Sequence, residues 1–255
     1  MNKPAIQFKH VRKSFGQNTV IPDLSFTVNA GEFVTVLGSS GCGKTTVLKM
    51  VNGLLSPTAG EILINSRPLV DQNLVQLRRH MGYVVQQIGL FPHMTVAKNI
   101  GLVPQMLNWN QDKIVSRVTE LLKLVQLEPA KYADRYPSQL SGGQQQRIGV
   151  ARALAVNPPY VLFDEPFGAL DALTRIELQK EIKHIHDTLK DKTFMFVTHD
   201  INEALFLGQR VMIMKDGQIE QFATPEEIVQ HPATQFVSDL LATTRQNQGL
   251  WGRSE

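Results

Sequence analysis

Residues 38–46 read Gly38-Ser39-Ser40-Gly41-Cys42-Gly43-Lys44-Thr45-Thr46 and directly follow the apolar run 33–37. This order predicts a buried strand, a glycine-rich loop and a helix over about 44–52. Glycines lack the Cβ atom that would keep successive backbone N–H groups from converging on an anion. The helix start adds a positive dipole end, and Lys44 adds a full charge. We therefore expect a phosphate-binding loop, with the Thr45 hydroxyl as a Mg²⁺ ligand. The simpler alternative is a Gly/Ser turn that precedes a helix by chance.

A second glycine-rich stretch precedes another apolar-rich segment, 148–156. It reads Leu140-Ser141-Gly142-Gly143-Gln144-Gln145-Gln146-Arg147. We expect a helix that ends at Asn157-Pro158-Pro159, so that the first N–H groups and a serine hydroxyl lie at its positive end. The chain thus has two helix starts suited to phosphate groups.

Together, these two stretches resemble the phosphate loop and the signature motif of the ATP-binding cassette (ABC) ATPases. Chance occurrence of both, in this order, is far rarer than that of either alone. In that family, the signature of one subunit closes over the nucleotide held by the phosphate loop of the other. The resemblance therefore implies a head-to-tail dimer with two shared ATP sites. Its signature residues would be Ser141, Gly142, Gly143 and Gln144.

Two carboxylates end the third informative stretch, Tyr160-Val161-Leu162-Phe163-Asp164-Glu165, which Pro159 and Pro166 bound. Its apolar part predicts a buried parallel strand, and such strands carry functional groups at their carboxyl ends. The alternative is a solvated acidic turn. The resemblance assigns Asp164 to Mg²⁺ and Glu165 to polarising the attacking water. Glu165 would act mainly by positioning, because phosphoryl transfer needs alignment and charge stabilisation more than a strong base.

Four smaller features complete the site that the resemblance implies. Gln86, or Gln87 if the assignment slips by one, matches the glutamine that contacts Mg²⁺ and water. His199 follows the β-like run 193–197 and matches the switch histidine that reaches the γ-phosphate. Asp171 matches the residue that crosses the dimer interface, and it also has the position of a helix N-cap. Phe15 matches the aromatic ring that stacks on adenine, with core packing as the alternative.

Composition predicts a cytosolic protein that reaches a membrane only through partners. The chain has 255 residues, 42% of them hydrophobic, and its single cysteine, Cys42, excludes an intramolecular disulfide. No apolar run approaches the roughly 18 residues that span a bilayer, and no signal peptide is recognisable at the start. The net charge is only +3, and the 26 basic and 23 acidic residues are interspersed. Nucleic acid is therefore not an expected partner.

The order of apolar runs predicts an α/β fold. Strands are expected at 6–11, 24–28, 33–37, 61–64, 81–85, 160–163, 193–197 and 210–214. Helical periods lie between them, notably at 113–125 and 178–189, and Asp216-Gly217 predicts a hairpin. The resemblance implies a P-loop NTPase of the ABC ATPase type, with a RecA-like parallel-sheet core and an antiparallel β edge. We expect one domain over 1–242, with a core of 1–86 and 158–242, a helical subdomain at about 87–157 and a polar tail at 243–255.

The segment 86–95, Gln86-Gln87-Ile88-Gly89-Leu90-Phe91-Pro92-His93-Met94-Thr95, resembles the ATPases of quaternary-amine osmoprotectant importers for glycine betaine, choline or carnitine. So do Asn99-Ile100, Val103-Pro104 and residues 164–171. The apolar part of this segment is expected on the surface, where ABC transporters receive the coupling helix of a membrane subunit. Ordinary loop packing is the alternative. The implied partners are permease subunits and, indirectly, a substrate-binding protein, at the cytoplasmic face of the plasma membrane.

Other functions remain open at this level. Many osmoprotectant ATPases continue into paired CBS regulatory domains, whereas this sequence ends after 243–255, so the resemblance does not imply regulation through such domains. It also fits importers of amino acids or of another betaine such as ergothioneine. A non-transport ABC ATPase would usually carry a long coiled-coil insert or a second cassette. The signature motif disfavours a monomeric P-loop kinase or GTPase.

Overall fold

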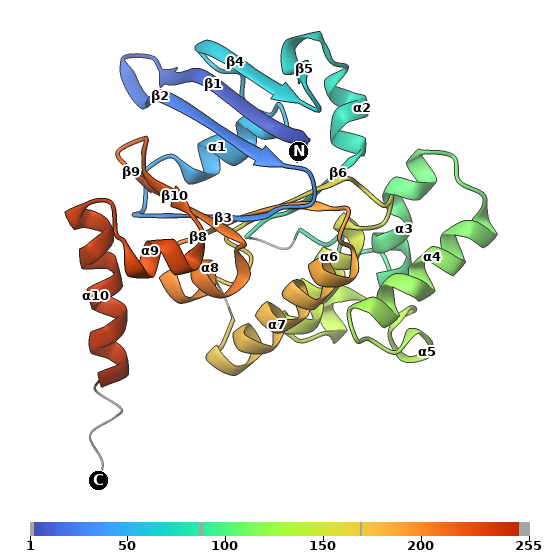
Figure 1. The fold of residues 1–255 in the computed structure, drawn as a ribbon. Coiled ribbons are helices and arrows are strands. Elements are labelled where there is room, and N and C mark those ends of the chain that lie inside the picture. The colour runs from blue at the N-terminus through green and yellow to red at the C-terminus, as the bar shows by residue number, and fades with distance from the viewer. Residues whose placement is uncertain (1–2, 87–88, 169, 250–255) are drawn as a thin grey trace. The chain divides into compact units, whose positions relative to one another are not determined.

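The computed structural model describes residues 3–86, 89–168 and 170–249 (Figure 1). The chain forms two compact units, one of Met1–Leu74 with Met195–Glu255 and one of Val75–Phe194. The second unit contains the helices of the predicted subdomain 87–157. It also contains two strands that the predicted division assigns to the core.

The first unit has a four-stranded sheet in the order β2-β1-β4-β5. Its strands are β1 (Pro4–Phe15), β2 (Asn18–Asn29), β4 (Ala59–Ile64) and β5 (Arg67–Pro68). The pairs β1/β2, β1/β4 and β4/β5 are antiparallel, which confirms the predicted antiparallel edge. β1 and β2 extend beyond the predicted runs because backbone pairing continues through polar residues whose side chains are partly exposed. Phe8 and Phe26 form a cross-strand pair with ring centroids 4.5 Å apart.

The other strands of this unit follow the order β10-β9-β3-β8. They are β3 (Phe33–Gly38), β8 (Thr193–Thr198, whose first two residues belong to the second unit), β9 (Arg210–Lys215) and β10 (Gln218–Ala223). β3 and β9 are parallel, and β9 and β10 form an antiparallel hairpin. The turn residues Asp216 and Gly217 have φ values of 48° and 76°, which confirms the hairpin that their sequence predicts. Every residue of β3 and β8 is buried, as expected for strands covered on both faces.

Helices cover these strands within the first unit. They are α1 (Lys44–Val51), α8 (Ile201–Leu207), α9 (Pro225–Gln230) and α10 (Gln235–Gly249), with a short 3-10 turn, η1 (Leu69–Asp71). One apolar cluster joins β3, β9, α8, α9 and α10. It consists of Leu37, Ile201, Ala204, Val211, Ile213, Ile228, Val237 and Leu241. The cluster holds β3, and so the start of the phosphate loop, in a rigid setting.

The second unit contains a parallel pair of strands, β6 (Met81–Val84) and β7 (Tyr160–Asp164). Its helices are α2 (Leu74–Arg79, beginning on the last residue of the first unit), α3 (Val96–Met106), α4 (Gln111–Leu124), α5 (Pro129–Tyr132), α6 (Gly142–Ala153) and α7 (Ala172–Thr188), with the 3-10 turn η2 (Pro137–Gln139). The predicted apolar face of α4 is buried, including Ile114, Val118 and Leu121. Gly82 permits close packing, because a Cβ there would lie 2.6 Å from the carbonyl oxygen of Ala153 at the end of α6.

Across the residues that the structure describes, we find no helix with the length and hydropathy needed to cross a bilayer.

Candidate active site

The predicted phosphate loop connects β3 to α1 in the first unit. Gly41 and Gly43 have φ values of 79° and 103°, a region that side chains with a Cβ rarely adopt. Gly38 is required for another reason, because a Cβ there would overlap the backbone carbonyl of Met214 in β9. The loop therefore needs glycine at all three positions in order to curl tightly before α1. A loop of this kind, in which glycines allow successive backbone N–H groups to converge, is the type of backbone that binds anions.

The Lys44 side chain turns back into this loop. Its Nζ donates to the carbonyl oxygens of Gly38 at 2.8 Å and Ser39 at 2.9 Å, and the residue is only 5% exposed. These two bonds use two of the three protons of the ammonium group. They hold a buried positive charge at the centre of the loop, where an anion would be attracted.

Cys42 anchors the loop rather than reacting. Its side chain is 4% exposed, and burial raises the pKa of the thiol. A protonated, buried thiol is a poor nucleophile. The Cys42 carbonyl accepts from the Gly217 N–H at 3.2 Å, which ties the loop to the β9/β10 hairpin.

His199 directly follows β8, the neighbour of the strand that leads into the loop. It is exposed, and its backbone is fixed on both sides. Thr198 donates to Glu203 at 2.6 Å, and Asp200 caps α8 through the N–H groups of Asn202 and Glu203. The imidazole thus projects from a rigid strand end.

Phe15 ends β1 and is 46% exposed. The core-packing alternative for this ring is therefore not supported. Lys13 Nζ lies 4.8 Å from the ring centroid and also donates to the Ser56 carbonyl at 2.8 Å. The ring is consequently oriented by a neighbour while remaining accessible.

The predicted carboxylates lie at the carboxyl end of β7 in the second unit. Asp164 Oδ2 accepts a hydrogen bond from the Tyr83 hydroxyl of β6 at 3.0 Å. Burial raises the pKa of Tyr83, and the Asp164 charge raises it further, so the phenol remains a donor. The sequence patterns did not point to Tyr83. The signal available was a hydroxyl group within the otherwise apolar run 81–85, and only the structure places this run beside the strand that ends at Asp164.

Glu165 has φ of 47°, which is unusual for a residue with a side chain. Strained backbone of this kind often occurs at functional sites, where it aims a side chain. Gln86 is far from Gly168 in the sequence, but the two meet in the fold. The Gln86 Nε2 atom is 3.1 Å from the position that a Cβ on Gly168 would take. Gly168 therefore leaves room for this amide. The alternative glutamine, Gln87, lies outside the described residues.

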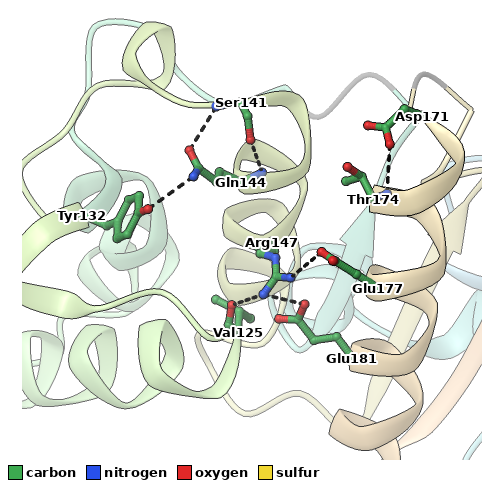
Figure 2. Close-up of polar contacts among 9 residues, drawn as sticks. All are labelled: Val125, Tyr132, Ser141, Gln144, Arg147, Asp171, Thr174, Glu177 and Glu181. Carbon is green, nitrogen blue, oxygen red and sulfur yellow. Dashed lines mark hydrogen bonds and ion pairs between the residues drawn. The ribbon is translucent and has the colours of Figure 1, made fainter.

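The signature stretch begins α6 with a capping box (Figure 2). Ser141 Oγ accepts from the Gln144 N–H at 3.3 Å, and Gln144 Oε1 accepts from the Ser141 N–H at 3.0 Å. The Gln144 amide also donates to the Tyr132 hydroxyl at 3.3 Å. The serine oxygen is thus engaged in the cap, so its proton is the part of the hydroxyl that can point to a ligand. Ser141 and Gly142 are exposed, whereas Gly143 is buried.

Asp171 is the N-cap of α7, as its sequence position predicts. Its Oδ1 accepts from the Thr174 N–H at 3.0 Å, and this bond is the main reason that the pKa of Asp171 is lowered. The carboxylate is solvent-exposed and charged at the start of a helix.

The residues predicted from the sequence fall into two sets. The first unit carries the phosphate loop, His199 and Phe15, and the second carries Asp164, Glu165, Gln86, the signature and Asp171.

Comparison with known proteins identifies the family. A model of the ABC transporter family matches residues 21–168. The carnitine transport ATP-binding protein OpuCA of Listeria monocytogenes is 52% identical over 241 residues, which cover 94% of this chain and 60% of that protein. The glycine betaine uptake system ATP-binding protein YehX of Escherichia coli is 47% identical over 232 residues, which cover 91% of this chain and 75% of that protein.

A solved structure is similar over most of its length. The dimeric post-hydrolysis state of the ATP-binding cassette MJ0796, bound to ADP and Pi, matches with a TM-score of 0.75 and 36% identity. The match covers 86% of this chain and 98% of that one. Fold and motifs therefore define a P-loop nucleotide-binding protein of the ATP-binding cassette class. The chain belongs to the ABC transporter family.

Proposed function

We propose that this chain is the ATP-hydrolysing subunit of an importer for quaternary-amine osmoprotectants such as glycine betaine, choline and carnitine. The observation that carries this proposal is the high identity to proteins named for carnitine transport and glycine betaine uptake, which extends over more than 90% of the chain. The chain spans about 60% of the length of the OpuCA protein that it matches. The family resemblance also fits an importer of amino acids or of another betaine.

ATP binding is assigned to the first unit. The phosphates would lie in the loop 38–46, against the backbone N–H groups and the Lys44 ammonium. Adenine would stack on the accessible ring of Phe15. A flat ring recognises the face of a base without reading its edge, so affinity for the base would come from stacking rather than from hydrogen bonds.

Hydrolysis is assigned to Glu165. ATP and water give ADP and phosphate, and the water must lie in line with the bond that breaks. The carboxylate of Glu165 accepts a hydrogen bond from this water and orients it, and its unusual backbone conformation favours one direction for the side chain. His199 and Gln86 would contact the γ-phosphate and the water.

The residues also fit Mg²⁺. Asp164 would supply a carboxylate, Thr45 a hydroxyl and Gln86 an amide oxygen, and Mg²⁺ prefers oxygen ligands of this kind. The hydrogen bond from Tyr83 orients the Asp164 carboxylate in the way that outer-shell groups orient metal ligands. Bound Mg²⁺ would neutralise charge on the phosphates during transfer.

We further propose that two copies associate head to tail. The exposed start of α6, with Ser141 and Gly142, would then close on the nucleotide held by the other copy. The similarity to a dimeric cassette supports this arrangement. ATP would favour the closed dimer because its phosphates contact both copies, and hydrolysis would release it.

The docking surface for a permease subunit is proposed in the second unit. A groove of about 550 Å³ is lined by Val75, Arg79, Phe91, Leu102, Met106 and Arg152, among others. Phe91 and Met106 are 39% and 55% exposed. Such exposed apolar residues beside a groove favour a helix as partner. Attachment through this groove would place the chain at the cytoplasmic face of the membrane.

Hydrogen bonds connect the rim of this groove to α3 and α6. The Asn99 side chain accepts from the Phe91 N–H at 2.8 Å and donates to the carbonyls of Phe91, Met94 and Thr95. Arg152 Nη1 donates to the Gly89 carbonyl at 2.8 Å. These hydrogen bonds restrain the rim 89–95, and a restrained surface loses less conformational freedom when a partner binds.

The test is the ATPase activity of this chain in lipid with its co-purifying membrane and substrate-binding partners. The activity is titrated with glycine betaine, choline, carnitine, ergothioneine and several amino acids, and the Glu165→Gln complex measures the background. We expect stimulation by a quaternary amine. Stimulation by amino acids alone would retain the importer and overturn the osmoprotectant assignment. Failure to recover any membrane partner would favour a non-transport ABC ATPase.

A further inference from the structure

The helices α6 and α7 contact each other closely at their N-terminal ends. Gly143 lies in the first turn of α6, and a Cβ there would lie 2.5 Å from the Thr174 Cγ2 atom in the first turn of α7. The absence of a side chain at Gly143 therefore allows the helix starts to approach. One of these helices begins at the signature and the other at Asp171 (Figure 2).

Arg147 makes a second connection one turn further along α6. Its Nη1 donates to the Val125 carbonyl at the end of α4 at 3.0 Å and lies 2.9 Å from Glu181 Oε2 on α7. Its Nη2 lies 3.9 Å from Glu177 Oε2, also on α7 (Figure 2). The arginine side chain is 15% exposed. One guanidinium group therefore joins three helices of the second unit.

The buried carboxylate of Glu181 has the Arg147 guanidinium as its counter-charge. Its side chain is 4% exposed, and within the described part of the chain neither carboxylate oxygen accepts a well-directed hydrogen bond. The attraction to Arg147 is thus mainly Coulombic, and it acts in a poorly hydrated place. Burial raises the pKa of Glu181 to about 7, with Arg147 opposing the shift and Glu177 adding to it. A buried carboxylate without ideal partners is costly, and such groups are often retained for a specific role.

We propose that Arg147 is a positioning residue that clamps α6 to α7, so that the signature and Asp171 reach the second copy as one rigid body. This inference rests on the proposed head-to-tail dimer. Arg147 itself touches no nucleotide in this scheme. It acts through Ser141 and Gly142 on α6 and through Asp171 on α7, which both need correct placement to meet the other subunit.

The test uses the full chain carrying Glu165→Gln, which is expected to bind ATP without hydrolysing it. Three quantities are measured: ATP binding by the monomer, ATP-driven dimer formation by sedimentation, and the melting temperature. In this background Arg147→Met is expected to retain ATP binding and to weaken dimer formation about tenfold or more, since small misplacements of positioned groups have large effects. Its melting temperature should fall, because Glu181 loses its counter-charge.

The double substitution Arg147→Met with Glu181→Gln separates positioning from folding. Removing the buried charge should restore the melting temperature, while dimer formation remains weak because the clamp is absent. Arg117→Met provides a matched control. Arg117 is 16% exposed and joins α4 to the far end of α6, where it donates to the carbonyls of Leu154 and Ala155. This variant should lose stability and keep ATP-driven dimer formation.

The outcomes are distinguishable. If the Glu165→Gln chain does not dimerise with ATP, the proposed dimer is wrong and the role of Arg147 falls with it. If that chain dimerises and Arg147→Met dimerises equally well, the clamp is wrong while the dimer stands. Recovery of dimer formation in the double variant would also overturn the clamp, because Arg147 would then serve only to balance the charge of Glu181.

Discussion

Individual residues carry the chemistry that is proposed for each of the two units. Lys44 is buried in the phosphate loop with its ammonium held by two carbonyls, and Glu165 follows β7 in a strained conformation. We expect Lys44→Ala to weaken MgATP binding about 10- to 100-fold, because hydrogen bonds to charged groups contribute about 1.5–3 kcal/mol. Equilibrium binding of a fluorescent ATP analogue measures this change.

Two further variants serve as comparisons for the Lys44→Ala binding measurement. Lys49→Ala alters a lysine of the same helix outside the loop and should retain affinity. Glu165→Gln should also retain affinity while lowering kcat about 100-fold or more, since the water is no longer oriented and polarised. Hydrolysis by Glu165→Gln at the wild-type rate would show that the catalytic assignment is wrong.

The sequence at the start of helix α6 has to satisfy two structural requirements. Its start must be glycine-rich for the signature, and it must also pack against α7. We expect Gly143→Ala to lower the free energy of unfolding by about 1–3 kcal/mol, because the new methyl group overlaps Thr174. Urea denaturation measures this loss.

The neighbouring position is the control for this packing effect. A Cβ on Gly142 would lie 3.6 Å from Leu170 Cδ2, an ordinary contact. Gly142→Ala should therefore be neutral or stabilise the fold by up to about 1 kcal/mol, since alanine favours helix. Adding Thr174→Ser to Gly143→Ala removes the overlapping methyl and should recover stability. An equal loss in both alanine variants would argue against close helix packing as the cause.

At the scale of the whole molecule, Glu181 couples stability to pH. Its pKa is raised in the folded protein from an ordinary value of 4.5 to about 7. Between these values the folded chain binds more protons than the unfolded chain, so the contribution of Glu181 to stability falls as pH rises through this window. Relative to Glu181→Gln, the wild-type free energy of unfolding should therefore decrease from pH 5 to pH 7.

The comparison with Glu181→Gln removes other titrations from this measurement. The pKa values of Asp171 and Glu227 are lowered by hydrogen bonds at helix starts, and both groups titrate alike in the two proteins. Denaturation curves at four or five pH values suffice. A difference between the two proteins that does not change with pH would show that Glu181 has an ordinary pKa in the folded state.

Local sequence patterns were sufficient to predict the fold class, the family and the motifs of the candidate site. The phosphate loop, the signature, the acidic strand end and the Asp216-Gly217 hairpin each lie within a few consecutive residues, and backbone preference and periodicity act over that range. The fold class and the family followed from them, and the structure and the comparisons confirm both. The roles of the individual site residues stay predictions.

Tertiary structure alone decided which distant residues support these motifs. Tyr83 meets Asp164 across 81 positions of sequence, and Arg147 meets Glu181 between two separate helices. The Cys42 carbonyl likewise meets the Gly217 N–H of a distant hairpin. No periodicity links such pairs, because each depends on how whole strands and helices pack. Short stretches of residues therefore specify the chemical groups of the candidate site and their local backbone, whereas packing specifies which charges and hydroxyls hold those groups in place.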